Sequence, residues 1–254
     1  MDLPPVGLGT MGIGDPSTIE TAIDVGYRHL DTAQIYDNEA VVREGVAASD
    51  VAREELTVAT KLWVDSLAGD DVRSGAEASL DRLGLDAVDL LYVHRPRGDY
   101  DPETTLPALD ELRESGLVGE VGLSNFEPDQ LEEAREVLDT PIGAHQVEFH
   151  PYYGDRELLA DAQAHDYPLV AYSPLIGGDA FDDPVLTDVA AKHDTSAAAV
   201  SIAWALSHDN VVTIPKASSR AHLRANFEAR TLALDPEDVE RIDGIEHERE
   251  LFPE

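Results

Sequence analysis

Short apolar runs alternate with helix-like segments along the whole chain, at intervals of about thirty residues. Apolar runs bounded by turn residues are typical of buried strands, and segments opened by Pro, Ser, Thr or Asp are typical of helices. The eight predicted strands are 6–10, 28–32, 56–61, 88–94, 119–124, 142–149, 168–172 and 211–214. The predicted helices lie near residues 17–26, 39–49, 70–83, 102–116, 128–138, 155–166, 195–208 and 219–230, with one extra helix over 236–246. Eight such units predict an α/β fold of the closed parallel (β/α)8 TIM barrel type, and because no linker interrupts residues 1–254 we expect a single domain.

The composition limits where the protein works and what it binds. No apolar run approaches the roughly 18 residues of a membrane span, and the N-terminus lacks a basic region followed by an apolar stretch, so we expect a soluble cytoplasmic protein. The absence of Cys excludes disulfides, thiolate nucleophiles and Cys metal sites. Acidic residues number 52 against 18 basic ones, and the resulting net charge of -34 argues against nucleic-acid and membrane partners.

The acidic residues are spread over every segment, and the chain has only three lysines. Self-repulsion among these charges is severe at low salt, whereas at about 1 M salt the screening length falls to roughly 3 Å. The surface therefore resembles that of proteins from halophiles. An ordinary acidic cytosolic enzyme is the alternative.

A glycine motif at the N-terminus suggests a different enzyme. Gly7, Gly9 and Gly12 have the G-x-G-x-x-G spacing of a dinucleotide-binding loop, and Asp31 follows nineteen residues after Gly12. Such a loop needs a full strand before it, but the five residues Met-Asp-Leu-Pro-Pro are too short and too Pro-rich for a central strand. The context therefore favours a barrel strand over a doubly wound dehydrogenase.

Four chemically active side chains follow predicted strands. Asp31, Lys61 and His94 stand at or next to strand ends, and Tyr36 lies in the loop beyond Asp31. In an α/β barrel these strand ends share one face, where the active site lies. An ammonium group is costly at the end of an apolar run unless a carboxylate such as Asp31 compensates it. Taken singly, Lys61 could instead reach solvent, and His94 could be a core residue.

The stretch that carries Asp31 and Tyr36 identifies a family. Residues 26–39 read Gly-Tyr-Arg-His-Leu-Asp-Thr-Ala-Gln-Ile-Tyr-Asp-Asn-Glu, which resembles the aldo-keto reductase signature Gly-aromatic-Arg-x-x-Asp-Thr-Ala-x-x-Tyr-x-x-Glu. Asp31, Tyr36, Lys61 and His94 match the catalytic tetrad of that family in type, order and spacing. The resemblance implies an NAD(P)H-dependent reduction of aldehydes, ketones or sugar-type carbonyls to alcohols.

The resemblance also assigns roles to the tetrad. Tyr36 would protonate the alkoxide as general acid, and Lys61 would lower the pKa of Tyr36 toward neutrality. Asp31 would keep Lys61 charged, and a neutral His94 would orient the substrate carbonyl. A cation about 4 Å from the phenol is worth roughly 4 kcal/mol at an effective dielectric near 20, before desolvation opposes it.

Further segments resemble the cofactor groove of the family. In this comparison Thr10 reaches the nicotinamide ribose, Ser124, Asn125 and Gln146 bind the carboxamide, and Tyr172 stacks under the ring. Ser173 and Leu175 approach the pyrophosphate. Each of these short segments alone also occurs in ordinary βα turns. The resemblance therefore rests on their occurring together and in the same order along the chain as in the family.

The segment that starts at Ile214 resembles the phosphate site of the family. Lys216 corresponds to the contact with the 2′-phosphate, and Asn226 also matches the pattern. Three departures weaken this clamp, because the usual Ser, Arg and Glu are Ala217, His222 and Ala225. Ser218, Ser219 and Arg220 could compensate. NADPH is therefore the expected cofactor, and NADH stays possible.

The same comparison places four residues at the substrate. Met11, Ile35 and Trp63 would face the substrate, with Asn125 at the edge, and Trp63 would suit an apolar wall of the pocket. Arg95 stands where relatives usually have an aromatic residue, so it could accept an anionic or hydroxylated substrate or simply turn to solvent. No set of residues keeps metal-ligand spacing, because His145 and His150 should face opposite ways, and we expect no metal.

Two family segments are shortened in this chain. An N-terminal β-hairpin that plugs the barrel is reduced, which predicts a more open barrel bottom, and the C-terminal loop is only a few residues long, which predicts broad selectivity. A monomer is expected. The alternative function is that of a cofactor-binding regulatory subunit with little turnover, which a panel of aldehydes would distinguish.

Overall fold

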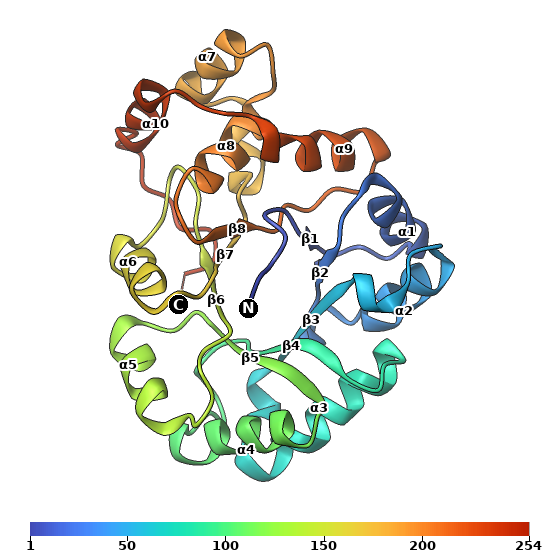
Figure 1. The fold of residues 1–254 in the computed structure, drawn as a ribbon. Coiled ribbons are helices and arrows are strands. Elements are labelled where there is room, and N and C mark those ends of the chain that lie inside the picture. The colour runs from blue at the N-terminus through green and yellow to red at the C-terminus, as the bar shows by residue number, and fades with distance from the viewer. Residues whose placement is uncertain (254) are drawn as a thin grey trace.

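A computed structural model describes residues 1–253, and its eight strands form one parallel sheet in chain order. The strands surround the centre of the molecule, with helices outside them (Figure 1). This order confirms the predicted (β/α)8 barrel. The strands are β1 (Leu8–Gly9), β2 (His29–Asp31), β3 (Thr57–Leu62), β4 (Val88–Val93), β5 (Val118–Ser124), β6 (Ala144–Glu148), β7 (Leu169–Tyr172) and β8 (Val211–Thr213).

The sheet closes between β8 and the residues just before β1. Val6 pairs in parallel with Thr213. The amide of Thr213 donates to the carbonyl of Pro5 at 2.9 Å, and the amide of Gly7 donates to the carbonyl of Thr213 at 2.8 Å. Closure removes the free sheet edges, and because all eight strands are parallel, their carboxyl ends lie at one face of the barrel.

Ten α-helices are found in residues 1–253, one more than the sequence predicted. The additional helix is α7, which begins at Pro184 because the carboxylate of Asp183 accepts the amides of Val185 and Leu186, each at 2.8 Å. The helices are α1 (Pro16–Val25), α2 (Glu39–Ala48), α3 (Gly69–Leu83), α4 (Pro102–Glu114), α5 (Pro128–Val137), α6 (Arg156–His165), α7 (Pro184–Lys192), α8 (Ala197–Leu206), α9 (Arg220–Glu228) and α10 (Pro236–Asp243). Short 3₁₀ helices are η1 (Gln34–Tyr36), η2 (Arg53–Glu55), η3 (Val64–Ser66), η4 (Ile176–Phe181) and η5 (Ala229–Thr231).

The buried side chains form two separate cores. Successive strand residues point to opposite faces, so Leu91 and Val93 of β4 join the large core under the helices, while Leu90 and Tyr92 join a smaller core inside the barrel. Inside the barrel, Tyr92 lies against Gly122, where an added Cβ would come within 2.4 Å of its ring. The apolar inner core supports the polar residues above it.

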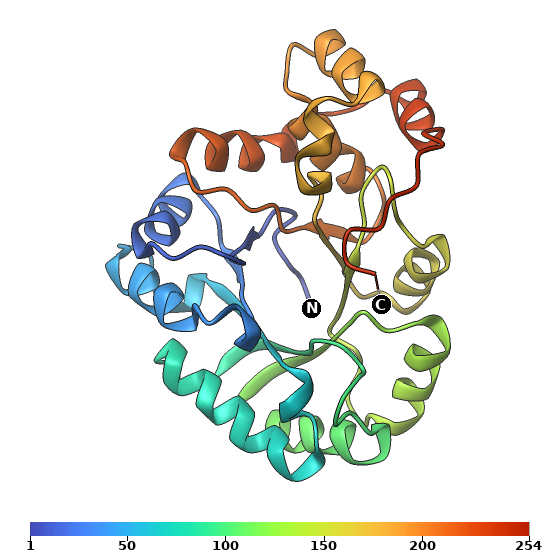
Figure 2. The same cartoon turned by 180° about the vertical axis from the view of Figure 1, so that it is seen from behind.

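The bottom of the barrel is covered, which corrects the expectation of an open end. Residues 1–7 form no hairpin, but Leu3 is only 7% exposed and packs with Leu90, Val170 and Val212 in the inner core. The N-terminus accordingly lies in the middle of the ring in both views (Figures 1 and 2). Leu3 thus closes this end of the inner core.

Among the helices of residues 1–253, none combines the length and the apolar character that crossing a membrane requires.

Candidate active site

A cavity of about 670 Å³ opens at the carboxyl ends of the strands. Most of the residues predicted for catalysis, cofactor binding and substrate binding line it. They are Thr10, Met11, Asp31, Ile35, Tyr36, Trp63, His94, Arg95, Ser124, Asn125, Gln146, Tyr172, Ser173, Leu175, Ile214 and Lys216.

Lys61 lies behind this cavity with its side chain fully buried. Its ammonium forms an ion pair with Asp31 and donates to the carbonyl of Thr32 at 2.8 Å. Burial, the largest single influence, lowers the pKa of Lys61, but Asp31 and Tyr36 together raise it above its ordinary value. Lys61 therefore remains a cation inside the barrel.

Asp31 is held from both sides of the barrel. One carboxylate oxygen accepts a hydrogen bond from the Lys61 ammonium. The other accepts a hydrogen bond from the side-chain amide of Gln146 on β6 at 2.8 Å. We expected Gln146 to bind the nicotinamide carboxamide, whereas the structure directs its amide nitrogen to Asp31. The hydroxyl of Thr10 also donates to the backbone carbonyl of Asp31 at 2.9 Å.

Tyr36 ends η1 at the rim of the cavity. The Lys61 nitrogen lies 5.2 Å from the centre of its ring, and the His94 ring meets it edge-on with centroids 5.8 Å apart. Burial raises the pKa of Tyr36 above its ordinary value, while the Lys61 cation opposes this shift. The expected lowering toward neutrality is thus wrong for this structure, because desolvation of the phenolate outweighs its attraction to Lys61.

His94 is neutral over the whole physiological range. Burial, helped by the neighbouring Lys61 and Arg95, lowers the pKa of His94 to about 2. Trp63 packs edge-on against the imidazole with centroids 5.0 Å apart. A neutral imidazole facing a cavity can donate one hydrogen bond to an uncharged oxygen.

Two residues just after Tyr36 fix its loop to the barrel. The amide nitrogen of Asn38 donates to the carbonyls of Thr10 and Ile13, and its oxygen accepts the hydroxyl of Thr32 at 2.8 Å. The buried carboxylate of Glu39 accepts the hydroxyl of Thr60, next to Lys61, at 2.6 Å. Tyr36 is thereby positioned relative to both members of the buried ion pair.

Glu39 is in turn charge-compensated from the helix layer, because Arg82 of α3 donates to its second oxygen at 2.6 Å.

The opposite side of the cavity carries a second polar network. The amide nitrogen of Asn125 donates to the carbonyl of His94 at 2.9 Å, and its oxygen accepts the hydroxyl of Tyr172 at 2.9 Å. Asn125, Ser173 and Ile176 adopt φ values of 59°, 55° and 55°. Such left-handed conformations are costly away from glycine, above all for a β-branched Ile, and they cluster at functional sites.

Comparison with known proteins agrees with this geometry. The sequence profile of the Aldo/keto reductase family matches residues 5–247. The chain belongs to the aldo/keto reductase family. Methylglyoxal reductase DkgB of Escherichia coli O157:H7 is 37% identical over all of this chain and 97% of its own length. Glyoxal reductase of Bacillus subtilis is 36% identical over all of this chain and 92% of its own length.

Solved structures show the same relationship. An aldo-keto reductase enzyme, MGS-M4, from a Medee basin deep-sea metagenome library is 31% identical, with a TM-score of 0.95 over all of this chain and 95% of its own. The aldose reductase of Schistosoma japonicum is 27% identical, with a TM-score of 0.93 over 99% of this chain and 91% of its own. This aldo/keto reductase is accordingly an NAD(P)H-dependent oxidoreductase that reduces carbonyl compounds.

The cavity of this aldo/keto reductase suits a nicotinamide dinucleotide. It offers the aromatic face of Tyr172, the polar groups of Ser124 and Asn125, and the cation Lys216. Asn226 of α9 is buried, and its amide nitrogen has no hydrogen-bond partner among the described residues. The residues present therefore fit the cofactor of the family.

Four of the predicted cofactor residues lie outside the cavity lining: Ser218, Ser219, His222 and Asn226. Ser219 has a structural duty, because its hydroxyl oxygen accepts the amide of His222 at 3.2 Å and caps α9. The side chains of Ser218 and His222 are exposed.

Sequence reasoning missed part of the cavity wall. Leu251 and Phe252 near the C-terminus line the cavity, as do Gly177, Gly178 and Phe181 of η4. The apolar pair at 251–252 follows a strongly acidic stretch, and this contrast is the signal that could have found it.

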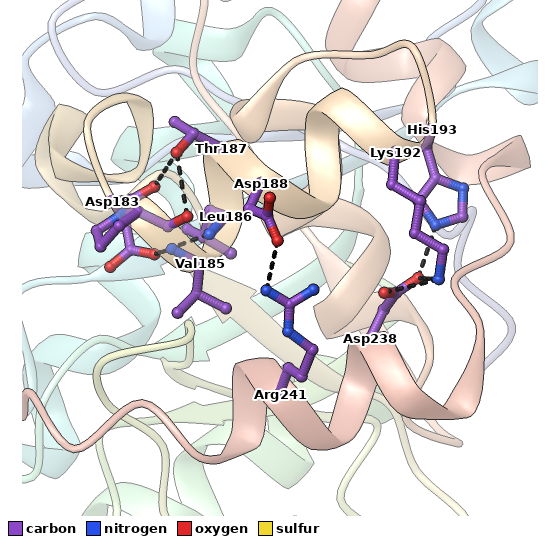
Figure 3. Close-up of polar contacts among 10 residues, drawn as sticks. Asp183, Val185, Leu186, Thr187, Asp188, Lys192, His193, Asp238 and Arg241 are labelled. Carbon is purple, nitrogen blue, oxygen red and sulfur yellow. Dashed lines mark hydrogen bonds and ion pairs between the residues drawn. The ribbon is translucent and has the colours of Figure 1, made fainter.

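One group of potential metal ligands lies outside the cavity lining, and a lysine ammonium occupies it. Within residues 1–253, His193, Asp235 and Asp238 are the side chains close enough together to share an ion. Lys192 of α7 instead donates to both oxygens of Asp238, at 2.9 and 2.8 Å, and His193 lies 2.7 Å from the same carboxylate (Figure 3). This cluster fastens α10 to α7.

A buried histidine below the tetrad predicts a pH-dependent stability. His29 is fully buried, neither ring nitrogen has a partner, and burial lowers its pKa to about 4. Between pH 6.5 and 4 the unfolded state gains a proton at this position that the native state does not, so stability falls as the pH falls. Replacing the titrating group should reduce this dependence: His29→Gln should lower the slope of the unfolding free energy by up to about 1 kcal/mol per pH unit.

Urea unfolding at several pH values measures the slope, with His222→Gln at an exposed histidine as the control. Parallel profiles for the wild type and His29→Gln would contradict the prediction.

Proposed function

We propose that this chain reduces aldehydes and ketones with Tyr36 as the general acid, Lys61 and Asp31 as its electrostatic support, and His94 as the group that orients the carbonyl. The observation that carries the proposal is the buried Lys61–Asp31 ion pair directly behind the phenol and the neutral imidazole. Residues 1–254 would act as one catalytic domain.

The cofactor, when bound, supplies a hydride to the carbonyl carbon. The electron pair of the C=O bond moves onto oxygen, and the resulting alkoxide takes the phenolic proton of Tyr36 to give the alcohol. Because its pKa is raised, Tyr36 holds this proton at neutral pH and is ready to donate it. His94, being neutral, donates a hydrogen bond to the same oxygen without repelling Lys61.

Lys61 acts on the phenolate that this transfer leaves behind. The Lys61 nitrogen lies 5.2 Å from the centre of the phenol ring, and a unit charge at about this distance, at an effective dielectric near 20, contributes roughly 3 kcal/mol. The pair with Asp31 ensures that this cation is present and fixed before the reaction, so no reorganisation is needed during it.

The relatives point to small carbonyl substrates. Two of the relatives named above are a methylglyoxal reductase and a glyoxal reductase, so short 2-oxoaldehydes are the first compounds to test. Sugar-type carbonyls are also proposed. Met11, Ile35 and Trp63 would contact the substituents, and Arg95 would favour hydroxylated or anionic ones.

NADPH is the proposed cofactor, with NADH as a possible second. Lys216 and the N-terminal end of α9, with Ser218, Ser219 and His222, would meet the 2′-phosphate, since a helix N-terminus attracts anions. Asn226 would add an amide donor, and Ile214 and Leu175 would pack on the cofactor.

The setting of the enzyme is inferred from its charge and composition. The net charge of -34 and the scarcity of lysine support activity at high salt, as in halophiles. A cytoplasmic monomer without nucleic-acid or membrane partners is the simplest arrangement.

Removing the phenolic hydroxyl tests the proposed acid. Tyr36→Phe should lower kcat for aldehyde reduction at least a thousandfold, because no other donor replaces the phenol, while the NADPH Kd stays within threefold. Steady-state kinetics and fluorescence titration measure the two quantities. Retained activity would remove Tyr36 from its role, and no turnover of any aldehyde by the wild type would favour the regulatory subunit.

Restoring the family arginine tests cofactor choice. His222→Arg should raise the NADPH to NADH ratio of kcat/KM about tenfold, because a guanidinium can bind phosphate through two hydrogen bonds. His165→Arg, at a distant exposed position, is the control for added charge. An unchanged ratio would mean that the 2′-phosphate is held elsewhere.

A further inference from the structure

The segment that follows α10 returns to the cavity, and we call residues 244–253 the C-terminal strap. Figure 2 shows it running from α10 across the β7 and β6 side of the ring. Its start is fixed because α10 is fastened to α7 through Lys192 and Asp238 (Figure 3). Its end brings Leu251 and Phe252 to the cavity wall.

We propose that Glu148 sets substrate selectivity as a positioning residue, by holding the C-terminal strap over the carbonyl pocket through its carboxylate; the proposal rests on the carbonyl reduction inferred above. Glu148 ends β6 and is only 4% exposed. One of its oxygens accepts the backbone amide of Leu251 at 2.7 Å, and the other accepts the amide of Phe252 at 3.1 Å.

His150 is the third hydrogen-bond donor to the Glu148 carboxylate. Its Nδ1 accepts the backbone amide of Tyr152 at 3.2 Å, so in the neutral ring the proton lies on Nε2. Nε2 therefore donates to Glu148 across 2.8 Å. The carboxylate is thus surrounded by three donors, two of which belong to the strap.

The strap and Glu148 depend on each other. A buried carboxylate is tolerated only when hydrogen-bond donors satisfy it, and here two of the donors come from the strap backbone. Other contacts also hold the strap: the amide of Arg249 donates to the carbonyl of Tyr152 at 3.0 Å, and the Arg249 guanidinium pairs with Asp179 of η4. The ring of His247 also meets that of Tyr152 edge-on. Among the hydrogen bonds described for residues 1–253, those to Glu148 act directly on the two residues that line the cavity.

These two residues supply an apolar contact for the part of a substrate beyond its carbonyl. Phe252 meets Tyr172 edge-on with centroids 5.9 Å apart, and Leu251 lies over Gly177. Their side chains are apolar and carry no hydrogen-bonding group. Contact with the strap should therefore contribute more binding free energy for an aldehyde with a large apolar substituent than for a short aldehyde.

Comparing propanal with 3-phenylpropanal isolates this contact, because the two aldehydes differ only in the phenyl group. Glu148→Gln replaces one acceptor oxygen by an NH2 group that faces a backbone amide, so the strap should loosen. We expect kcat/KM for 3-phenylpropanal to fall at least fivefold, through KM, and that for propanal to stay within twofold. Phe252→Ala should reproduce this pattern. In the double variant Phe252→Ala/Glu148→Gln, the ratio of kcat/KM for 3-phenylpropanal to kcat/KM for propanal should differ less than twofold from that of Phe252→Ala.

Glu246→Gln makes the same chemical change at an exposed position of the strap, and should leave the ratio within twofold. Amide hydrogen exchange gives a readout that needs no turnover, and Leu251 and Phe252 should exchange at least tenfold faster in Glu148→Gln. An equal loss for both aldehydes, an unchanged ratio, or unchanged exchange would overturn the proposal.

Failure of the proposed reaction is recognised separately. If the wild type reduces neither aldehyde, binding of 3-phenylpropanol and propanol to the cofactor-bound enzyme, measured by calorimetry, takes the place of the kinetics. A selectivity between the alcohols that Glu148→Gln leaves unchanged would then refute the role of Glu148.

Discussion

The buried pair of Lys61 and Asp31 is the interaction on which the active site depends. Placing an ammonium and a carboxylate inside a barrel is unfavourable unless each has close partners. The closed sheet provides them, because Gln146 comes from β6 and reaches Asp31 on β2 across the interior. The inner apolar core, including Leu3 and Tyr92, supports this polar layer and keeps water away from it.

The phenol depends on the pair but is held by other residues. Tyr36 is carried on a short 3₁₀ helix, and Asn38 and Glu39 tie the following residues to the strands that bear Asp31 and Lys61. On the far side, the unusual backbone conformations of Asn125 and Ser173 place polar groups at the cavity. The site therefore combines side chains from the strands, such as Asp31 and Lys61, with side chains from loops that the barrel holds in place.

Much of this arrangement could be predicted from the sequence, because barrel units repeat and the strand ends share one face. The eight strands and the convergence of Asp31, Lys61 and His94 follow from that rule, although the role of each residue stays a prediction. The helix α7 was missed, since its cap at Asp183 stands inside a long connection.

The remaining failures concern contacts that no local pattern encodes. The C-terminal strap reaches the cavity through its bonds to Glu148, more than a hundred residues earlier in the chain. The direction of the Tyr36 pKa was predicted wrongly, because the sequence reveals the neighbouring cation but not the extent of burial. Desolvation and attraction oppose each other, and only the structure shows which is larger.

The pKa of Tyr36 itself measures whether the buried cation supports the phenolate. It can be followed by NMR titration of the protein carrying ¹³C-labelled tyrosine, in the wild type and in Lys61→Met. The account predicts that Tyr36 titrates at a higher pH in Lys61→Met than in the wild type, because the main influence that opposes the effect of burial on its pKa is then absent. An equal or lower pKa in Lys61→Met would contradict it.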